Sequence, residues 1–137
     1  MSDKPRREEY HSTRSLIDKL GVKIDSRVTV MGIDDETFWR QLTDRIHDVA
    51  TERLRRDTDI IFFAADNQSQ LKKLVRLKTY LRPDGAIWVV SLKGKAAKIK
   101  DVDVIAAAKA AGLVDNKVVS FSATHTALRL VIPVDQR

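Results

Sequence analysis

The stretch Asp59-Ile60-Ile61-Phe62-Phe63-Ala64-Ala65 decides the fold, and Ala86-Ile87-Trp88-Val89-Val90 has the same character further along the chain. Residues 60–65 and 86–90 are apolar without a break and rich in β-branched and aromatic side chains. A continuous run of this kind is typical of a strand covered on both faces, whereas alternating apolar and polar residues would indicate a strand with one face exposed to solvent. The two runs therefore predict adjacent central strands, with Ile61, Phe62, Phe63 and Trp88 buried.

A helix is predicted between these strands, and a helical crossover of this kind makes them parallel. Its inward side is expected to carry Leu71, Leu74, Val75, Leu77 and Leu81. Pro83 is expected to stop the helix, because the residue before a proline avoids the α conformation. Asp84-Gly85 then supplies a turn into the second strand.

Weaker patterns precede this centre. The sequence predicts a short helix capped by Ser12 or Thr13, a strand over residues 27–31 and a helix that starts near Asp35. Residues 47–58 could continue that helix or form a short edge strand, and we interpret them as a poorly formed strand or loop. No second strong strand is therefore predicted before Asp59.

Further patterns follow the centre. A basic loop comes after Val90, and then a helix capped by Asp101 or Asp103 and closed by Gly112. Two strands complete the chain, over residues 117–122 and 127–133. The alternation in the last strand suits an antiparallel strand that is half covered.

Composition limits the classes of protein that fit. The chain has 137 residues, of which 43% are hydrophobic and 32% charged, as in a globular protein with one core. It has no cysteine, which excludes disulfides and zinc–thiolate sites. Residues 1–11 are predicted to be a disordered tail, and residues 12–137 a single α/β domain. No apolar run reaches the roughly 20 residues of a membrane helix, and the N-terminus does not resemble a signal peptide, so we expect a cytoplasmic protein without a membrane partner.

Positive charge is concentrated in the middle of the chain. The net charge of the whole chain is +6, yet residues 68–100 alone hold nine Lys and Arg against the single acid Asp84, which gives +8. Such asymmetry favours an anionic partner, although lysine-rich surfaces also serve solubility. The candidate anion-binding residues are Lys72, Lys73, Arg76, Lys93, Lys95 and Lys98. They form one surface if the helix packs beside the loop.

The order of elements resembles a shortened class I methyltransferase. The step Leu81-Arg82-Pro83-Asp84-Gly85 is similar to the "L-R-P-G-G" helix exit of those enzymes, and a closing antiparallel pair completes the likeness. The resemblance implies a three-layer, Rossmann-like α/β fold. Its truncated sheet would be mainly parallel and end in a C-terminal antiparallel hairpin.

The chain resembles more closely a family of short bacterial proteins of unknown function related to that fold. The shared motifs are Leu20-Gly21-Val22-Lys23, Pro83-Asp84-Gly85-Ala86-Ile87-Trp88-Val89, Lys93, Ala111-Gly112-Leu113-Val114 and Leu128-Arg129. In the final hairpin, His125 stands where the family is expected to have a tryptophan, and Ser122-Ala123 replaces an acidic pair.

Candidate cofactor residues follow the first strand. A methyltransferase loop needs glycines there, so that the backbone can approach the ligand, and an acid after the second strand to hold the ribose. This chain offers one glycine, Gly32, followed by Ile33, Asp34 and Asp35, which crowd the approach. We interpret this segment first as a plain turn with Asp35 as a helix cap.

Asp66 and Asn67 follow the buried strand at its carboxyl end, where open α/β sheets place their ligands. Helix capping explains the pair as well as binding does. If the site is functional, Asp66 is the candidate catalytic residue and Asn67 a candidate cofactor ligand.

The favoured interpretation is a non-catalytic methyltransferase-like domain that binds a protein or an anionic ligand and needs no cofactor. One alternative is a methyltransferase that uses S-adenosylmethionine through an atypical loop around Gly32. Another is a nucleic-acid-binding protein that uses the basic segment. No metal is expected, because His11, His47 and His125 lack metal-ligand spacing.

Overall fold

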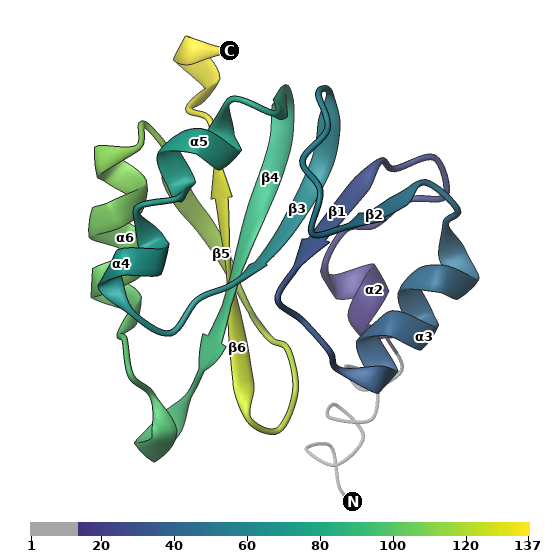
Figure 1. Ribbon diagram of the computed structural model, residues 1–137, viewed down its shortest axis with the longest axis horizontal. Coiled ribbons are helices and arrows are strands. Elements are labelled where there is room, and N and C mark those ends of the chain that lie inside the picture. The colour runs from purple at the N-terminus through teal and green to yellow at the C-terminus, as the bar shows by residue number, and fades with distance from the viewer. Residues whose placement is uncertain (1–13) are drawn as a thin grey trace, which may run out of the picture.

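The computed structural model describes residues 14–137, which form a six-stranded sheet between two layers of helices (Figure 1). The strands are β1 (Val28–Met31), β2 (Val49–Thr51), β3 (Thr58–Ala64), β4 (Leu81–Leu92), β5 (Val114–Ser120) and β6 (His125–Val131). Their order across the sheet is β2-β1-β3-β4-β6-β5. The first four are parallel, and β6 runs antiparallel to both β4 and β5. The predicted fold class is confirmed.

Helices cover both faces of the sheet (Figure 1). One face carries α2 (Leu16–Lys19) and α3 (Glu36–Arg45), and the other carries α4 (Gln68–Leu71), α5 (Leu74–Lys78) and α6 (Asp101–Ala110). Two single 3₁₀ turns, η1 (Gly94–Ala96) and η2 (Val134–Gln136), complete the structure. No helix in the described part of the chain is long and apolar enough to span a bilayer.

The two runs that decide the fold lie side by side at the centre. Phe62 of β3 is paired in register with Trp88 of β4, and both are almost fully buried. Side chains alternate between the two cores: Ile61 and Phe63 face α4–α6, while Phe62 and Trp88 face α2 and α3. The Trp88 Nε1 atom donates a 3.1 Å hydrogen bond to the Leu20 carbonyl, so the buried indole has a partner. The predicted central strands are confirmed.

The prediction of a single helix between these strands is wrong in its extent. It is divided into α4 and α5, and α5 ends at Lys78. Val75, expected inside, is 58% exposed, and Leu81 is the first residue of β4. Pro83 lies within β4 rather than at a helix end, because the extended conformation before a proline suits a strand equally well. Helical spacing of leucines continued past the true end of the helix and concealed this boundary.

The turn predicted at Asp84-Gly85 is also wrong, because β4 continues through it. The pairing of β3 with β4 shifts register between Thr58 and Ile60, opposite this segment. Such an irregularity tolerates both a proline without an N–H and a glycine without a side chain. A Cβ atom on Gly85 would lie only 2.8 Å from the Asp59 carbonyl oxygen. Gly85 is therefore required by close backbone approach and not by a turn.

The segment 47–58 contains a strand that the sequence did not clearly predict. It includes β2, three residues long, which pairs in parallel with β1 at the edge of the sheet. Asp48, just before β2, accepts hydrogen bonds from Arg27 and Arg55. The bond from Arg55, and then that from Arg27, hold the pKa of the Asp48 carboxyl below its usual value.

Helix and strand ends differ by small steps from the predictions. Ser15 caps α2 with its side chain, whereas the predicted caps Ser12 and Thr13 lie outside the described residues, as does the predicted tail. Lys100 is the N-cap of α6, and the Asp103 carboxylate accepts from its backbone N–H at 2.8 Å. Both C-terminal strands begin and end earlier than predicted. β6 lies inside the sheet and is covered on both faces, not half covered.

Candidate functional site

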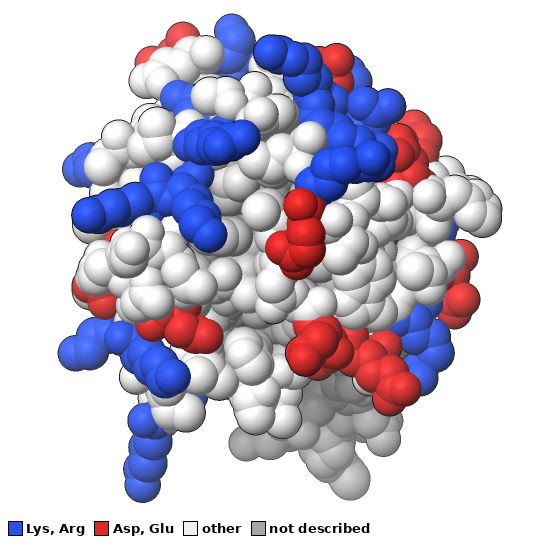
Figure 2. Space-filling model, in the orientation of Figure 1, with Lys and Arg blue, Asp and Glu red and all other residues white. Residues whose placement is uncertain are grey.

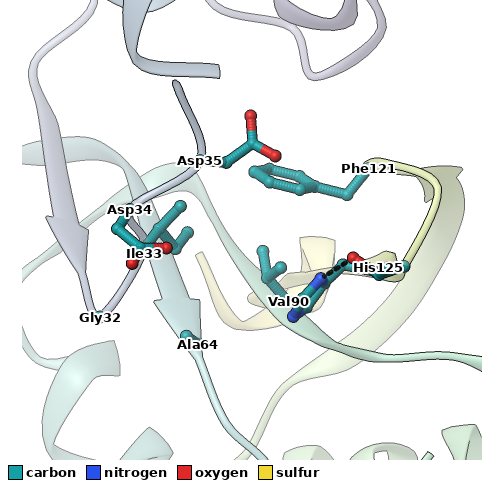
Figure 3. A pocket seen from close by; sticks show the side chains of 9 residues that line it. Gly32, Ile33, Asp34, Asp35, Ala64, Val90, Phe121 and His125 are labelled. Carbon is teal, nitrogen blue, oxygen red and sulfur yellow. Dashed lines mark hydrogen bonds between the residues drawn. The ribbon is translucent and has the colours of Figure 1, made fainter. Parts of the chain in front are cut away.

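A crevice opens at the carboxyl ends of β1 and β3, where the strand order reverses. From β1 the chain passes to β2 on one side, and β3 then lies on the other side. Open α/β sheets bind ligands at such a switch point. The crevice has a volume of about 210 Å³. It is lined by Gly32, Ile33, Asp34, Asp35, Ala64, Val90, Phe121, Thr124 and His125 (Figure 3).

The turn after β1 forms one wall of the crevice, and contacts made by its own residues fix its conformation. Gly32 has φ +78°, and a Cβ atom on it would lie 3.2 Å from the Ala64 Cβ, so glycine fits both the backbone angle and the narrow space. Asp35 accepts a 2.8 Å hydrogen bond from the Phe38 N–H and caps α3 as predicted. The Trp39 Nε1 atom donates to the Ile33 carbonyl at 2.8 Å.

Glu52 binds the backbone of this turn at Gly32. Its Oε2 atom accepts a 2.6 Å hydrogen bond from the Gly32 N–H. Glu52 directly follows β2, so the structure does supply an acid after a second strand, contrary to the expectation from sequence. Its backbone has φ +56°, a conformation that is unusual outside glycine and that often occurs at functional sites.

The opposite wall comes from the β5–β6 hairpin. Phe121 is buried, and the His125 ring lies beside Val90, across the crevice from the turn (Figure 3). The His125 Nδ1 atom is 2.8 Å from the Thr124 hydroxyl oxygen. The hairpin thus adds an imidazole and a hydroxyl to a site whose other wall carries two carboxylates.

Asp66 and Asn67 do not line this crevice. The Asn67 side chain accepts a 2.8 Å hydrogen bond from the Gln70 N–H and caps α4. The Asp66 N–H donates to the Gln70 side chain at 2.7 Å, and its carboxylate faces the Leu92 N–H at 3.4 Å. The structure therefore brings Gly32, Asp34 and Asp35 together and leaves this pair occupied with local contacts.

The six basic candidates are divided among separate places on the surface. Lys73 and Arg76 line one hollow, and Lys72 lines a groove beside α6. Lys93 lines a third hollow near η1, where its ammonium donates to the Ser120 hydroxyl at 2.7 Å. Lys95 and Lys98 are exposed in the segment after β4. Figure 2 shows the corresponding separation, with basic groups at different places and acidic and uncharged residues between them.

The hollow that holds Lys73 and Arg76 is the larger of the two candidate sites. Its volume is about 460 Å³, and Arg53 adds a third cation. Met31, Leu54, Leu77 and Tyr80 give it an apolar part, and the acidic residue Glu52 also lines it. The carboxylate of Glu52 is hydrogen-bonded to Gly32, so the same residue touches the crevice and the hollow.

Sequence analysis missed several lining residues. Glu52 and Arg53 follow a three-residue strand, too short for a periodic signal, and only the acid after Val-Ala-Thr could have indicated a role. Tyr80 was hidden by the incorrect helix boundary. Phe121 and Thr124 lie on the final hairpin, which sequence pattern alone cannot place opposite β1.

Solved structures similar to this fold are S-adenosylmethionine-dependent methyltransferases and related proteins. Magnesium protoporphyrin IX methyltransferase from Synechocystis PCC 6803, with bound SAM, has a TM-score of 0.63 and 10% identity, over 86% of this chain and 74% of that one. Aeropyrum pernix fibrillarin, with natively bound S-adenosyl-L-methionine, has a TM-score of 0.61 and 15% identity, over 80% of this chain and 67% of that one. A TehB-like SAM-dependent methyltransferase from Corynebacterium glutamicum has a TM-score of 0.56 and 12% identity, over 86% of this chain and 85% of that one.

At this level of identity the likeness establishes the fold alone. Several further neighbours are longer, and the chain spans between 42% and 54% of their length. Among curated proteins, no sequence is similar enough to match. Residues 17–134 match a family described as "Protein of unknown function (DUF3052)".

Proposed function

Because the chain belongs to this family of unknown function, we propose its role from the two sites described above. It is a methyltransferase-like domain that does not transfer methyl groups. It binds a small anionic ligand in the basic hollow lined by Arg53, Lys73 and Arg76. The fold by itself carries neither conclusion, since function belongs to the site.

The hydrogen bond between Glu52 and Gly32 is the observation that supports a non-catalytic role. A cofactor at the switch point needs a free backbone donor on the turn after β1. The Gly32 N–H, the first donor of this turn, already pairs with the Glu52 carboxylate 2.6 Å away. The crevice of about 210 Å³ is also smaller than the roughly 300–1,000 Å³ of ordinary small-molecule sites.

The hollow beside α5 better fits a ligand of moderate size. Its volume of about 460 Å³ falls within the usual range. Arg53, Lys73 and Arg76 supply positive charge, while the carboxylate of Glu52 is engaged by Gly32. The apolar side chains around Tyr80 would contact an uncharged part of the ligand. A phosphate-bearing compound with an aromatic or apolar group combines both features.

The first prediction is that S-adenosylmethionine does not bind usefully. In calorimetric titration of the cofactor into the purified protein, we expect no binding with a Kd of about 10 μM or tighter. The physical reason is that Glu52, the acid in the place of a ribose ligand, is engaged by Gly32, and each ribose hydroxyl left without a partner costs about 1–3 kcal/mol. Two or three such losses remove micromolar affinity.

A cofactor-binding methyltransferase remains the second candidate, and Glu52 is the specific observation that favours it. An acid after the second strand is where a ribose ligand belongs in this class of fold. If a Kd of about 10 μM or tighter were measured, Glu52→Gln should weaken it at least tenfold, the usual size of a lost charged hydrogen bond. Glu36→Gln, an exposed acid on α3, is the matched control. Tight binding lost only in Glu52→Gln would replace our proposal by this candidate.

The second prediction concerns anions. At low salt we expect ATP to bind, and added salt to weaken the binding because the cations of the hollow are exposed. Arg76→Glu should raise the Kd at least tenfold, since a charge-assisted hydrogen bond contributes about 1.5–3 kcal/mol. Lys98→Glu makes the same change of charge outside the hollow and should have a much smaller effect.

Three further results decide between the anion proposals. Equal losses in Arg76→Glu and Lys98→Glu would mean diffuse attraction and contradict a site in the hollow. Binding of a labelled RNA oligonucleotide much more tightly than ATP would favour the nucleic-acid interpretation. Absence of binding to ATP, inorganic triphosphate and RNA at low salt would leave solubility as the role of the lysines.

A further inference from the structure

Helix α6 has an outer face that residues 14–137 leave exposed. Val102 is 67% exposed and Ile105 36% exposed, and Ala106 and Ala110 are exposed beside them. The buried side of the helix consists of Val104 and Ala108, so α6 is apolar on both sides. Exposed apolar side chains that lie together on a surface often mark a site of contact with a partner. The outer face of α6 therefore has the composition of a contact surface.

A groove runs along this face. It lies between α6 and the pair α4 and α5 and has a volume of about 360 Å³. Val75, which sequence analysis placed inside, is 58% exposed and forms its far wall, opposite Ala106 and Ala110. Because alanine side chains are short, another helix can approach the groove closely. The outer face of α6 and Val75 together make a largely apolar surface, and Gln68, Lys72 and Asp103 add polar groups along the groove.

The charges on α6 determine which partner fits. Asp101 and Asp103 occupy its first turn, and Lys109 its last. At the left of Figure 2, where α6 lies, an uncharged area separates basic from acidic groups, and further basic groups lie beyond the acidic ones. If two copies of α6 pair antiparallel, each Lys109 lies near the acidic turn of the other helix. A parallel pair would place like charges together.

We propose that the protein forms a homodimer through α6, with the two copies of the helix antiparallel about a two-fold axis near Ile105. A two-fold interface is self-complementary, so the same surface must present both signs of charge at opposite ends. The α6 sequence meets this requirement. Across the axis the two Ile105 side chains pack against each other, and the aliphatic stem of Lys109 covers Val102 of the second copy.

The size of the surface sets the strength of the dimer. A helix of ten residues is about 15 Å long. One face of so short a helix cannot supply the roughly 800 Å² of surface that each partner buries in a standard interface. The groove beside α4 and α5 must therefore be part of the contact. The dimer therefore belongs to the weak, concentration-dependent class.

Sedimentation velocity of the full chain over a range of concentrations tests this proposal. The average mass should rise from 15.5 kDa towards twice that value. Ile105→Lys places two cations at the axis and should weaken dimerisation at least tenfold. Lys109→Glu should weaken it by repelling Asp101 and Asp103. The exchange Asp101→Lys with Lys109→Glu should restore much of the loss, and only an antiparallel contact gives this result.

Matched variants separate the α6 surface from the other exposed apolar positions. Ile24→Lys and Val118→Lys replace residues that are 81% and 57% exposed, the second on the edge strand β5. Both should leave the mass unchanged. A monomer at all concentrations would overturn the proposal. Loss of the dimer in Val118→Lys but not in Ile105→Lys would also overturn it, and would assign the contact to β5. Circular dichroism confirms that each variant is folded.

Discussion

Replacing Phe62 by alanine is expected to lower the free energy of unfolding by about 3–5 kcal/mol, the usual cost of removing a buried aromatic side chain. Phe62 is fully buried on β3, between β1 and β4. Its ring meets Phe38 of α3 edge to face, with centroids 4.9 Å apart and planes at 73°. The substitution therefore removes contacts between the central strand and the helix layer above it. Chemical denaturation with urea measures the change.

A conservative change at the same position gives the control. Phe62→Leu keeps most of the apolar volume and should cost less than about 1.5 kcal/mol. A loss below about 1 kcal/mol for Phe62→Ala would mean that β3 is not the centre of the core. A change in the denaturant slope as well as the midpoint would indicate an altered denatured or native state rather than a simple cavity.

Replacing Gly85 by alanine is the second large effect that we expect. The added Cβ atom would lie 2.8 Å from the Asp59 carbonyl oxygen and 3.1 Å from that of Thr58. Both atoms belong to the backbone of the paired region, so neither can turn aside as a side chain would. The strands must separate locally, and overpacking of this kind costs about 1–3 kcal/mol. Thermal and urea denaturation should both detect it.

The neighbouring residue supplies the control for this substitution. Asp84 has an exposed side chain and only a distant ion pair with Arg82, so Asp84→Ala should change stability by less than about 0.5 kcal/mol. Equal stability of Gly85→Ala and the parent protein would contradict the close approach of β3 and β4. It would also reopen the prediction of an ordinary turn at this position.

The centre of the fold was predictable because burial on both faces leaves a simple pattern. Ile61, Phe62 and Phe63 are consecutive apolar residues, as expected for a strand whose two faces are covered by helices. The helix between the strands was misjudged because Leu77 and Leu81 have helical spacing, although Leu81 is already in β4. Periodicity reports which residues are buried, but it does not report where the backbone changes conformation.

The candidate site was less predictable because it depends on pairing between distant segments. Gly32 and Asp35 were identified from the turn chemistry that the structure confirms. Glu52 was not, because β2 has only three residues and gains its structure from β1 rather than from its own sequence. His125 was judged by metal spacing along the chain, whereas its position opposite the turn arises from the order of strands in the sheet.

The edge position of β2 has a consequence for local unfolding. Three residues pair this strand to the sheet, and within the described part of the chain no strand pairs with its other side. The loop that follows begins with Glu52 and ends with Asp57, both in the left-handed conformation, which costs about 1–2 kcal/mol per residue. Amide protons there should exchange with solvent sooner than those of β3. When this edge opens, the Glu52 carboxylate leaves Gly32 and the Gly32 N–H becomes free. Local opening at an edge strand would thus control a donor at the switch point.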